Sequence, residues 1–135
     1  MRITCSPTLS AKRRITFVRS FGVSAFHAGD AFTLVSEVEG LPCSLIEAMA
    51  AGVTPVVSDI PAHTQIVEHE KSGIVTKLGD ERSIADGYIR VLDDAPLRRR
   101  LAEHARERMV EEFSTARVVD RYEELFADCV KRPLR

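Results

Sequence analysis

The chain has 135 residues, a length that suits a single domain with one hydrophobic core. Hydrophobic residues make up 44% of it and charged residues 29%, a balance typical of a soluble globular protein. Its 19 basic and 20 acidic residues leave a formal net charge of -1, which gives no support for a nucleic-acid partner. No apolar run approaches a transmembrane segment, and the N-terminus lacks the apolar core of a signal peptide, so we expect a cytoplasmic protein.

The three cysteines, Cys5, Cys43 and Cys129, lie far apart in the sequence. They have no CxxC or Cys/His spacing of the kind that binds zinc. We therefore interpret them as reduced thiols and expect no metal site.

Residues 1–13 carry several basic and hydroxyl side chains without apolar periodicity, which predicts a loose basic leader. The folded domain is then expected over residues 14–135. Apolar and β-branched runs predict about four short strands, at residues 14–18, 31–35, 53–58 and 74–76. The run at 31–35 is almost continuously apolar, which is typical of a parallel strand covered on both faces.

Helices are expected between these strands, one after Pro42 and a short one that ends near Val67. This alternation of strands and helices predicts an α/β fold with a parallel sheet. From Gly79 onward the pattern is helical, with Asp80 as the N-cap of the first of two or three consecutive helices. The stripe of the first is Ile84, Tyr88, Val91 and Leu92; that of the second is Leu97, Leu101, Ala105 and Met109. Ser114 is expected to cap a third helix with a buried stripe of Val118, Tyr122, Leu125, Phe126 and Cys129.

The most informative stretch is the turn and helix over residues 39–52. A helix N-terminus collects unpaired amides and the positive end of the peptide dipoles, so an anion such as a diphosphate suits it. Glu39 lies in the turn and Glu47 in the helix, and a carboxylate can accept two hydrogen bonds from vicinal hydroxyls. A ligand with a diphosphate between two groups of vicinal hydroxyls, those of a sugar and of a ribose, is a nucleotide sugar. Gly52 is expected to end the helix at the C′ position.

The spacing of polar residues in this helix has a second interpretation. Ser44 and Glu47 have the spacing of a capping box, in which each side chain bonds the backbone amide of the other residue. On spacing alone this structural role and the binding role are equally favoured, and one does not exclude the other.

With these residues in place, the chain resembles the C-terminal, nucleotide-sugar-binding part of the retaining GT-B glycosyltransferases of family 4, also called glycosyl transferase group 1. The resemblance runs from about Arg14 to the C-terminus. Its most specific part is a pair of glutamates in the pattern Ser36-x-x-Glu39-Gly40-x-Pro42, then Glu47-Ala48-Met49-Ala50-x-Gly52-x-x-Pro55-Val56-Val57-Ser58-Asp59. Gly79-Asp80, the run Leu92-Asp93-Asp94-x-Pro96-Leu97-Arg98, and Phe113-Ser114 before the last helix also follow the family's pattern.

The resemblance implies a role for each matching residue. Glu39 would contact hydroxyls of the donor sugar and Glu47 would hold the ribose hydroxyls. Between them, two groups of residues would face the sugar and the diphosphate: Gly40, Leu41 and Pro42 as the turn, and Ser44 and Leu45 as hydrogen-bond donors to the diphosphate. The resemblance implies a UDP-, GDP- or ADP-sugar as substrate, with no cofactor and no metal. No catalytic residue is assigned, and His27 and His63 are interpreted as structural because no nucleophile pairs visibly with either.

The resemblance also implies half of a GT-B architecture, a truncated Rossmann-like sheet without the acceptor domain. We therefore expect a glycosyltransferase donor half that transfers hexose weakly or not at all by itself. The alternatives are a catalytically silent nucleotide-sugar module, a donor-binding subunit that needs a separate acceptor-domain partner, and a structural remnant without a ligand.

A truncated sheet should leave one strand edge open. By the resemblance, residues 31–35 correspond to the fourth strand of the doubly wound order and residues 15–18 to the third, so the two strands between them are missing. An apolar edge of this kind pairs readily with another strand. We expect either residues 15–18 or a second copy of the chain, in a homodimer, to cover it.

Overall fold

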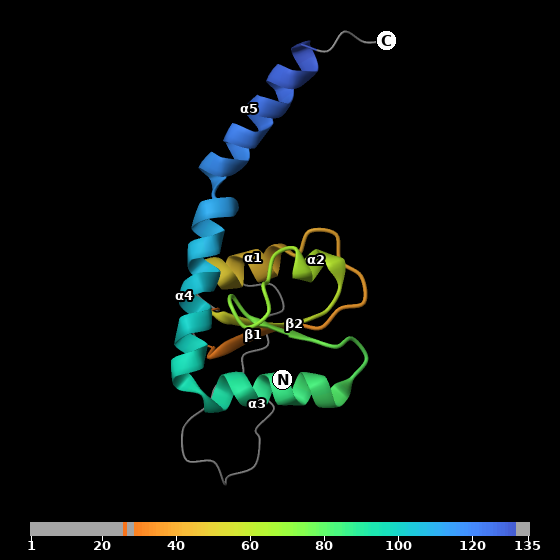
Figure 1. The fold of residues 1–135 in the computed structure, drawn as a ribbon, viewed down its shortest axis with the longest axis vertical. Coiled ribbons are helices and arrows are strands. Elements are labelled where there is room, and N and C mark those ends of the chain that lie inside the picture. Colours follow the sequence, from red (N-terminus) through yellow and green to blue (C-terminus); the bar gives the residue numbers. More distant parts are fainter. Residues whose placement is uncertain (1–25, 27–28, 132–135) are drawn as a thin grey trace.

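The computed structural model describes Phe26 and residues 29–131. Figure 1 shows a small parallel sheet between helical layers, followed by two long helices. The elements are β1 (Ala31–Leu34), α1 (Cys43–Ala50), β2 (Thr54–Ser58), α2 (Pro61–Thr64), β3 (Ile74–Thr76), α3 (Glu81–Asp93), α4 (Ala95–Glu112) and α5 (Thr115–Lys131). The predicted α/β fold is therefore confirmed, and so is the order of its elements from residue 31 onward.

The sheet has the order β1-β2-β3, and both strand pairs are parallel. In its register Ala31 pairs with Thr54, and Val56 pairs with Ile74. Helices α1 and α2 lie on one side of the sheet and α3 on the other (Figure 1). Three of the four predicted strands are present. The remaining one, at residues 14–18, lies outside the described part of the chain, as does the predicted leader.

Strand β2 is the centre of the fold, because all five of its residues are buried. Successive side chains of a strand point to opposite faces, so Val57 packs with Leu45 and Met49 of α1 while Val56 packs with Ile74 and the helices of the other face. Strand β1 has neighbours on both faces, as predicted for residues 31–35, because Phe32 and Leu34 pack against the α1 layer and Ala31 against the opposite layer, but the strand is less buried than predicted. Every residue of β1 is only half-buried, because β2 is its one strand neighbour within the described residues.

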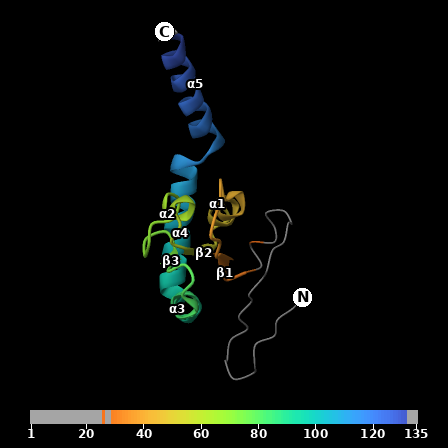
Figure 2. The ribbon, with the colours of Figure 1, turned by 90° about the vertical axis from the view of Figure 1, so that its right-hand side faces the viewer.

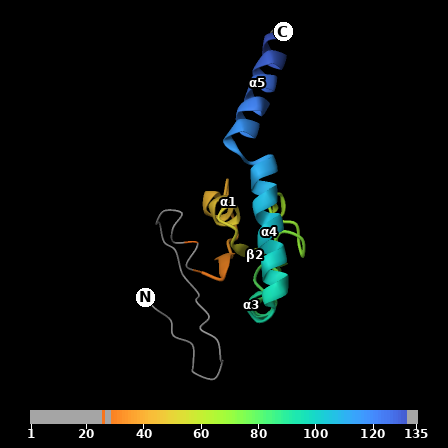
Figure 3. The ribbon, with the colours of Figure 1, turned by 90° about the vertical axis from the view of Figure 1, so that its left-hand side faces the viewer.

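Helix α4 crosses the amino ends of the strands and joins the two layers. Its buried residues, Leu97, Leu101, Ala105 and Met109, are those of the predicted stripe. The first two pack into the layer below the sheet, and the last two pack with α1 above it. The side views confirm that α4 runs beside the sheet along its whole height (Figures 2 and 3). The Thr54 hydroxyl fixes it to the start of β2 by donating to the Arg98 carbonyl over 2.7 Å.

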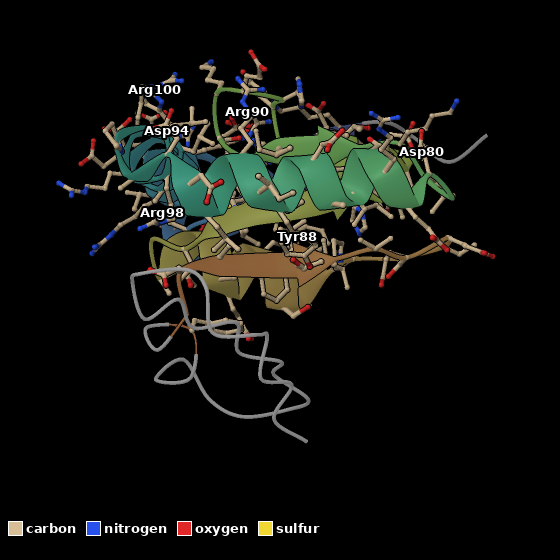
Figure 4. The ribbon with its side chains drawn as sticks, turned by 90° about the horizontal axis from the view of Figure 1, so that it is seen from below. Asp80, Tyr88, Arg90, Asp94, Arg98 and Arg100 are labelled. Atoms are coloured by element: carbon tan, nitrogen blue, oxygen red, sulfur yellow. The ribbon has the colours of Figure 1, made fainter. Side chains whose placement is uncertain are left out.

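Helix α3 lies across the underside of the sheet, as Figure 4 shows from below. Asp80 is its N-cap as predicted and accepts from the Ser83 amide at 3.0 Å. The Tyr88 side chain interacts with Thr33, and partial burial of the phenol raises the pKa of Tyr88. Arg98 of α4 donates to the Val91 and Leu92 carbonyls near the end of α3, so its side chain lies at the junction of the two helices.

Helix α5 differs most from its prediction. It forms where expected, after Ser114, but none of its residues is buried. Its apolar stripe is exposed because α5 continues away from α4 and stands clear of the sheet in all three ribbon views. The predicted buried stripe of Val118, Tyr122, Leu125, Phe126 and Cys129 is therefore wrong in its burial and right in its periodicity. In the part of the chain that the structure describes, no helix is long and apolar enough to cross a bilayer.

Two glycines give a matched test of this packing. A Cβ on Gly73 would stand 2.6 Å from the Pro55 side chain, 2.7 Å from Val67 and 2.8 Å from the Pro55 carbonyl oxygen, whereas a Cβ on Gly40 would meet nothing within 4 Å. We expect Gly73→Ala to lower the free energy of unfolding by about 1–3 kcal/mol. Gly40→Ala should change it by less than about 0.5 kcal/mol. Urea unfolding followed by circular dichroism measures both, and equal effects would contradict the packing described.

Candidate functional site

The predicted site residues lie at the carboxyl end of the sheet, opposite the edge that α4 covers. Residues 35–42 lead from the end of β1 to the start of α1 and form the orange loop on the right of Figure 1. The loop after β3 lies next to the loop after β2, because the Leu78 amide donates to the Asp59 carboxylate at 2.8 Å. Ligands of open α/β sheets bind outside the carboxyl ends of the strands, so this edge is where a site is expected.

The helix N-terminus offers one unpaired amide in its first turn. The Leu45 and Ile46 amides both donate to the Pro42 carbonyl, at 3.0 and 3.2 Å, and the Cys43 amide donates to the Leu41 carbonyl at 2.9 Å. The Ser44 amide has no hydrogen-bond partner among the described residues. This amide is therefore the one that a ligand can occupy without displacing a bond of the chain.

The capping box is not formed. The N-cap of α1 is Pro42, which makes no side-chain cap bond, and Ser44 is already the second residue of the helix. A capping serine must have non-helical dihedrals, so Ser44 cannot act as the cap of a helix that begins at Cys43. This structural explanation for the Ser44 and Glu47 spacing is wrong.

The other end of α1 has the predicted glycine. Gly52 has φ +74° and follows the C-cap Ala51. Its amide donates to the Met49 carbonyl at 2.9 Å, and the Val53 amide donates to the Ala48 carbonyl at 3.0 Å. These two bonds form a Schellman motif, which fixes where α1 ends and β2 begins.

The seven predicted site residues divide by exposure. Gly40, Leu41, Ser44 and Glu47 are exposed, Glu39 is half-buried, and Pro42 and Leu45 are buried. The Leu45 side chain is fully buried in the core of the upper layer, so it anchors the helix and does not face solvent. The Glu47 carboxylate makes no ion pair or hydrogen bond with the described residues, which leaves both its oxygens free to accept.

A chain of hydrogen bonds, which the sequence analysis missed, holds the turn from behind. The Ser58 hydroxyl donates to the Ser36 carbonyl at 2.8 Å and accepts from the Ser36 amide at 3.2 Å. The Ser36 hydroxyl in turn donates to the Glu39 carboxylate at 2.7 Å. Behind Ser58 lies His63, which is fully buried, with Nδ1 3.1 Å from the Ser58 carbonyl oxygen and 3.2 Å from its hydroxyl. The predicted structural role of His63 agrees with this burial; His27 lies outside the described residues.

Charged groups near the start of β3 are already paired with one another. Glu68 is paired with Lys71 and Arg108, and the hydrogen bond from Lys71 lowers the pKa of its carboxyl group. The hydrogen bond from Arg90 likewise lowers the pKa of Glu70. These ion pairs lie towards α4, away from the turn over residues 39–42. No three His, Cys, Asp or Glu side chains of the described chain lie together as a possible metal site.

The three-stranded parallel sheet between helical layers, with an exposed turn and a helix N-terminus at its carboxyl edge, is the architecture of an open, Rossmann-like α/β domain. The family model for glycosyl transferases group 1 matches residues 14–108. The chain belongs to this family, and its fold is that of the C-terminal domain of GT-B glycosyltransferases.

Two curated relatives show how much of such a protein the chain represents. It is 32% identical to N-acetyl-alpha-D-glucosaminyl L-malate synthase of Bacillus anthracis. The 102 aligned residues cover 76% of this chain and 27% of the relative. The chain is also 32% identical to UDP-Gal:alpha-D-GlcNAc-diphosphoundecaprenol alpha-1,3-galactosyltransferase of Escherichia coli. The 103 aligned residues cover 76% of this chain and 26% of that relative. The chain thus spans about a quarter of the length of these enzymes.

Solved structures share the fold. The C-terminal domain of LpcC, a glycosyl transferase group 1 family protein of Francisella tularensis, superposes with a TM-score of 0.64 at 20% identity, over 75% of this chain and 53% of that one. The Anabaena protein Alr3699/HepE, solved with UDP and glucose, superposes with a TM-score of 0.73 at 19% identity, over 78% of this chain and 29% of that one.

The two roles considered for Ser44 differ in their effect on stability. Because Ser44 does not cap α1, Ser44→Ala should change the free energy of unfolding by less than about 0.5 kcal/mol. Asp80→Ala removes a real N-cap bond and should cost about 0.5–2 kcal/mol. Parallel urea titrations compare the two variants. A loss at Ser44 as large as that at Asp80 would restore the capping role.

Proposed function

We propose that the chain binds a nucleoside-diphosphate sugar at the turn over residues 39–42 and the start of α1. Glu39 contacts hydroxyls of the sugar, Gly40, Leu41 and Pro42 form the turn against the sugar and phosphates, and Glu47 accepts from the ribose hydroxyls. Ser44 supplies its amide and hydroxyl to the diphosphate, and Leu45 anchors this helix end and adds its amide, which bonds Pro42 when no ligand is bound.

The observation that carries the proposal is the unpaired Ser44 amide at the mouth of α1. It points to an anion because the amides of a helix N-terminus act with the peptide dipoles, and an exposed carboxylate one turn further on suits vicinal hydroxyls. The family membership supports the same ligand class: one relative is a UDP-Gal transferase, and a protein that shares the fold has been solved with UDP and glucose.

The chain is proposed to supply the donor half of a retaining, metal-independent transfer of a hexose. Glycosyl transfer also needs a positioned acceptor and charge stabilisation on the leaving diphosphate. The described residues near the turn provide neither, so we infer that an acceptor domain or a partner chain completes the site. The alternatives are a homodimer through the edge of β1 that has no strand neighbour among the described residues, and a silent nucleotide-sugar module. Transfer or hydrolysis of labelled donor by the purified chain distinguishes active from silent forms.

Nucleotide binding and the role of Glu47 can be tested together. In a thermal-shift screen of UDP, GDP and ADP, one nucleotide should raise the melting temperature of the chain more than the others. Glu47→Ala should then weaken binding of that nucleotide about tenfold to a hundredfold in calorimetry, because a carboxylate that bonds two hydroxyls is lost.

The matched control is Glu103→Ala, which removes an exposed glutamate from α4 on the far side of the sheet. It should leave the affinity unchanged. If no nucleotide binds, or if the two glutamate variants lose affinity equally, the proposed site is wrong.

Gly40 gives a test that does not remove any hydrogen bond. Its φ is not left-handed, and a Cβ there would meet no atom of the chain, so the fold itself does not require glycine. The proposed ligand does require it, because the turn must approach the sugar closely. Gly40→Val should keep the stability within about 0.5 kcal/mol and weaken nucleotide-sugar binding at least about tenfold. Normal affinity in this variant would place the ligand elsewhere.

A further inference from the structure

The hydrogen-bond chain behind the turn connects a buried histidine to a proposed ligand residue. It runs from His63 in α2 to Ser58 at the end of β2, then to Ser36 after β1, and ends at the Glu39 carboxylate. Each link is between 2.7 and 3.2 Å, and the bonds between Ser58 and Ser36 join two segments that are 22 residues apart in the sequence. Glu39 is therefore held from inside the protein.

The direction of each bond follows from the chemistry of the groups. A carbonyl oxygen can only accept, so the His63 Nδ1 that faces the Ser58 carbonyl must carry a hydrogen. The Ser58 hydroxyl has one hydrogen, which goes to the Ser36 carbonyl, and its lone pairs accept from the Ser36 amide and face Nδ1. Both backbone groups of Ser36 are thereby fixed, which leaves its own hydroxyl aimed at Glu39.

We propose that His63 is a positioning residue for the donor sugar: through Ser58 and Ser36 it fixes the carboxylate of Glu39 at the mouth of α1. This inference rests on the proposed function, because Glu39 is there the group that contacts the sugar. It gives the buried histidine a role in recognising the hexose, while the nucleotide part of the ligand is held by α1 independently.

Only one nitrogen of the imidazole takes part. The His63 Nε2 is buried and has no hydrogen-bond partner among the described residues. The role of His63 thus depends on its Nδ1 donor, and a side chain that offers an N–H at the same place should replace it. Asparagine has such an amide N–H, whereas leucine has a similar bulk and no donor.

The test separates the sugar from the nucleotide. Calorimetry gives the dissociation constants of UDP and UDP-glucose, with GDP and GDP-mannose and ADP and ADP-glucose in parallel, for the wild-type chain and its variants. Within each pair, the dissociation constant of the nucleotide divided by that of the nucleotide sugar measures how much the sugar contributes to binding. His63→Leu and Ser36→Ala should each lower this ratio about tenfold, while binding of the bare nucleotide changes less than about twofold. His63→Asn should restore the ratio.

Each outcome decides between the inferences. If the wild-type chain binds none of the probes, the proposed function fails and this inference fails with it. If it binds and Glu39→Gln lowers the ratio but His63→Leu and Ser36→Ala do not, the site stands and the positioning role is wrong. If His63→Asn is as defective as His63→Leu, the Nδ1 donor is not what matters, and the role is again wrong.

A measurement without ligand protects the test against a variant that folds poorly. Ser36 is half-buried, so Ser36→Ala removes the last link without disturbing the core. The side-chain carboxyl carbon of Glu39 reports its hydrogen bond in nuclear magnetic resonance spectra. Its resonance should move in Ser36→Ala and His63→Leu and stay in place in His63→Asn. An unchanged resonance in both of the first two variants would overturn the connection itself.

Discussion

The burial of β2 on both faces is the constraint on which the rest of the structure depends. Its valines alternate between the two layers, so α1 and α2 must cover one face while α3 covers the other. The close approach of Gly73 to Pro55 shows how little space remains around this strand. Every loop of the candidate site starts from the sheet that this burial fixes in place.

The two ends of the sheet have different tasks. At the amino ends α4 closes both layers, and ion pairs of Glu68 and Glu70 with basic side chains join the neighbouring loop to the helices. At the carboxyl ends the loops are held by buried and partly buried hydrogen bonds, while Gly40 and Leu41 of the turn before α1 are exposed. One end of the sheet is therefore covered by a packed helix, and exposed polar groups at the other end remain available to a ligand. This division agrees with the general position of ligands in open α/β sheets.

Local signals in the sequence predicted much of the fold. Glycine at the C′ position, aspartate at an N-cap and apolar residues spaced four apart depend on a few neighbouring residues, so the ends of α1, the cap of α3 and the stripe of α4 could be found without coordinates. The turn and its two glutamates were found through their pattern. The interpretation of Ser44 as a cap failed because it depended on the exact first residue of α1, which Pro42 sets.

What the sequence could not show depends on contacts between distant segments. Nothing in the local pattern links His63 to Ser36, because the connection passes through the end of β2. The half-burial of β1 and the exposure of α5 have the same origin: an apolar pattern indicates which residues of an element avoid water but not whether another element covers them. The neighbours of these two elements cannot be deduced from periodicity alone.

Because α5 stands apart from the sheet, the two parts of the chain should differ in their stability against unfolding. A helix of 17 residues that buries no side chain resembles a free peptide, and peptide helices of that length are marginal in water. Backbone amides beyond Phe113 should therefore exchange with deuterium within the time of local fraying, whereas those of β2 should exchange only through global opening. The cooperative folding unit consequently ends at the junction between α4 and α5, and shortening the chain there should preserve its unfolding transition.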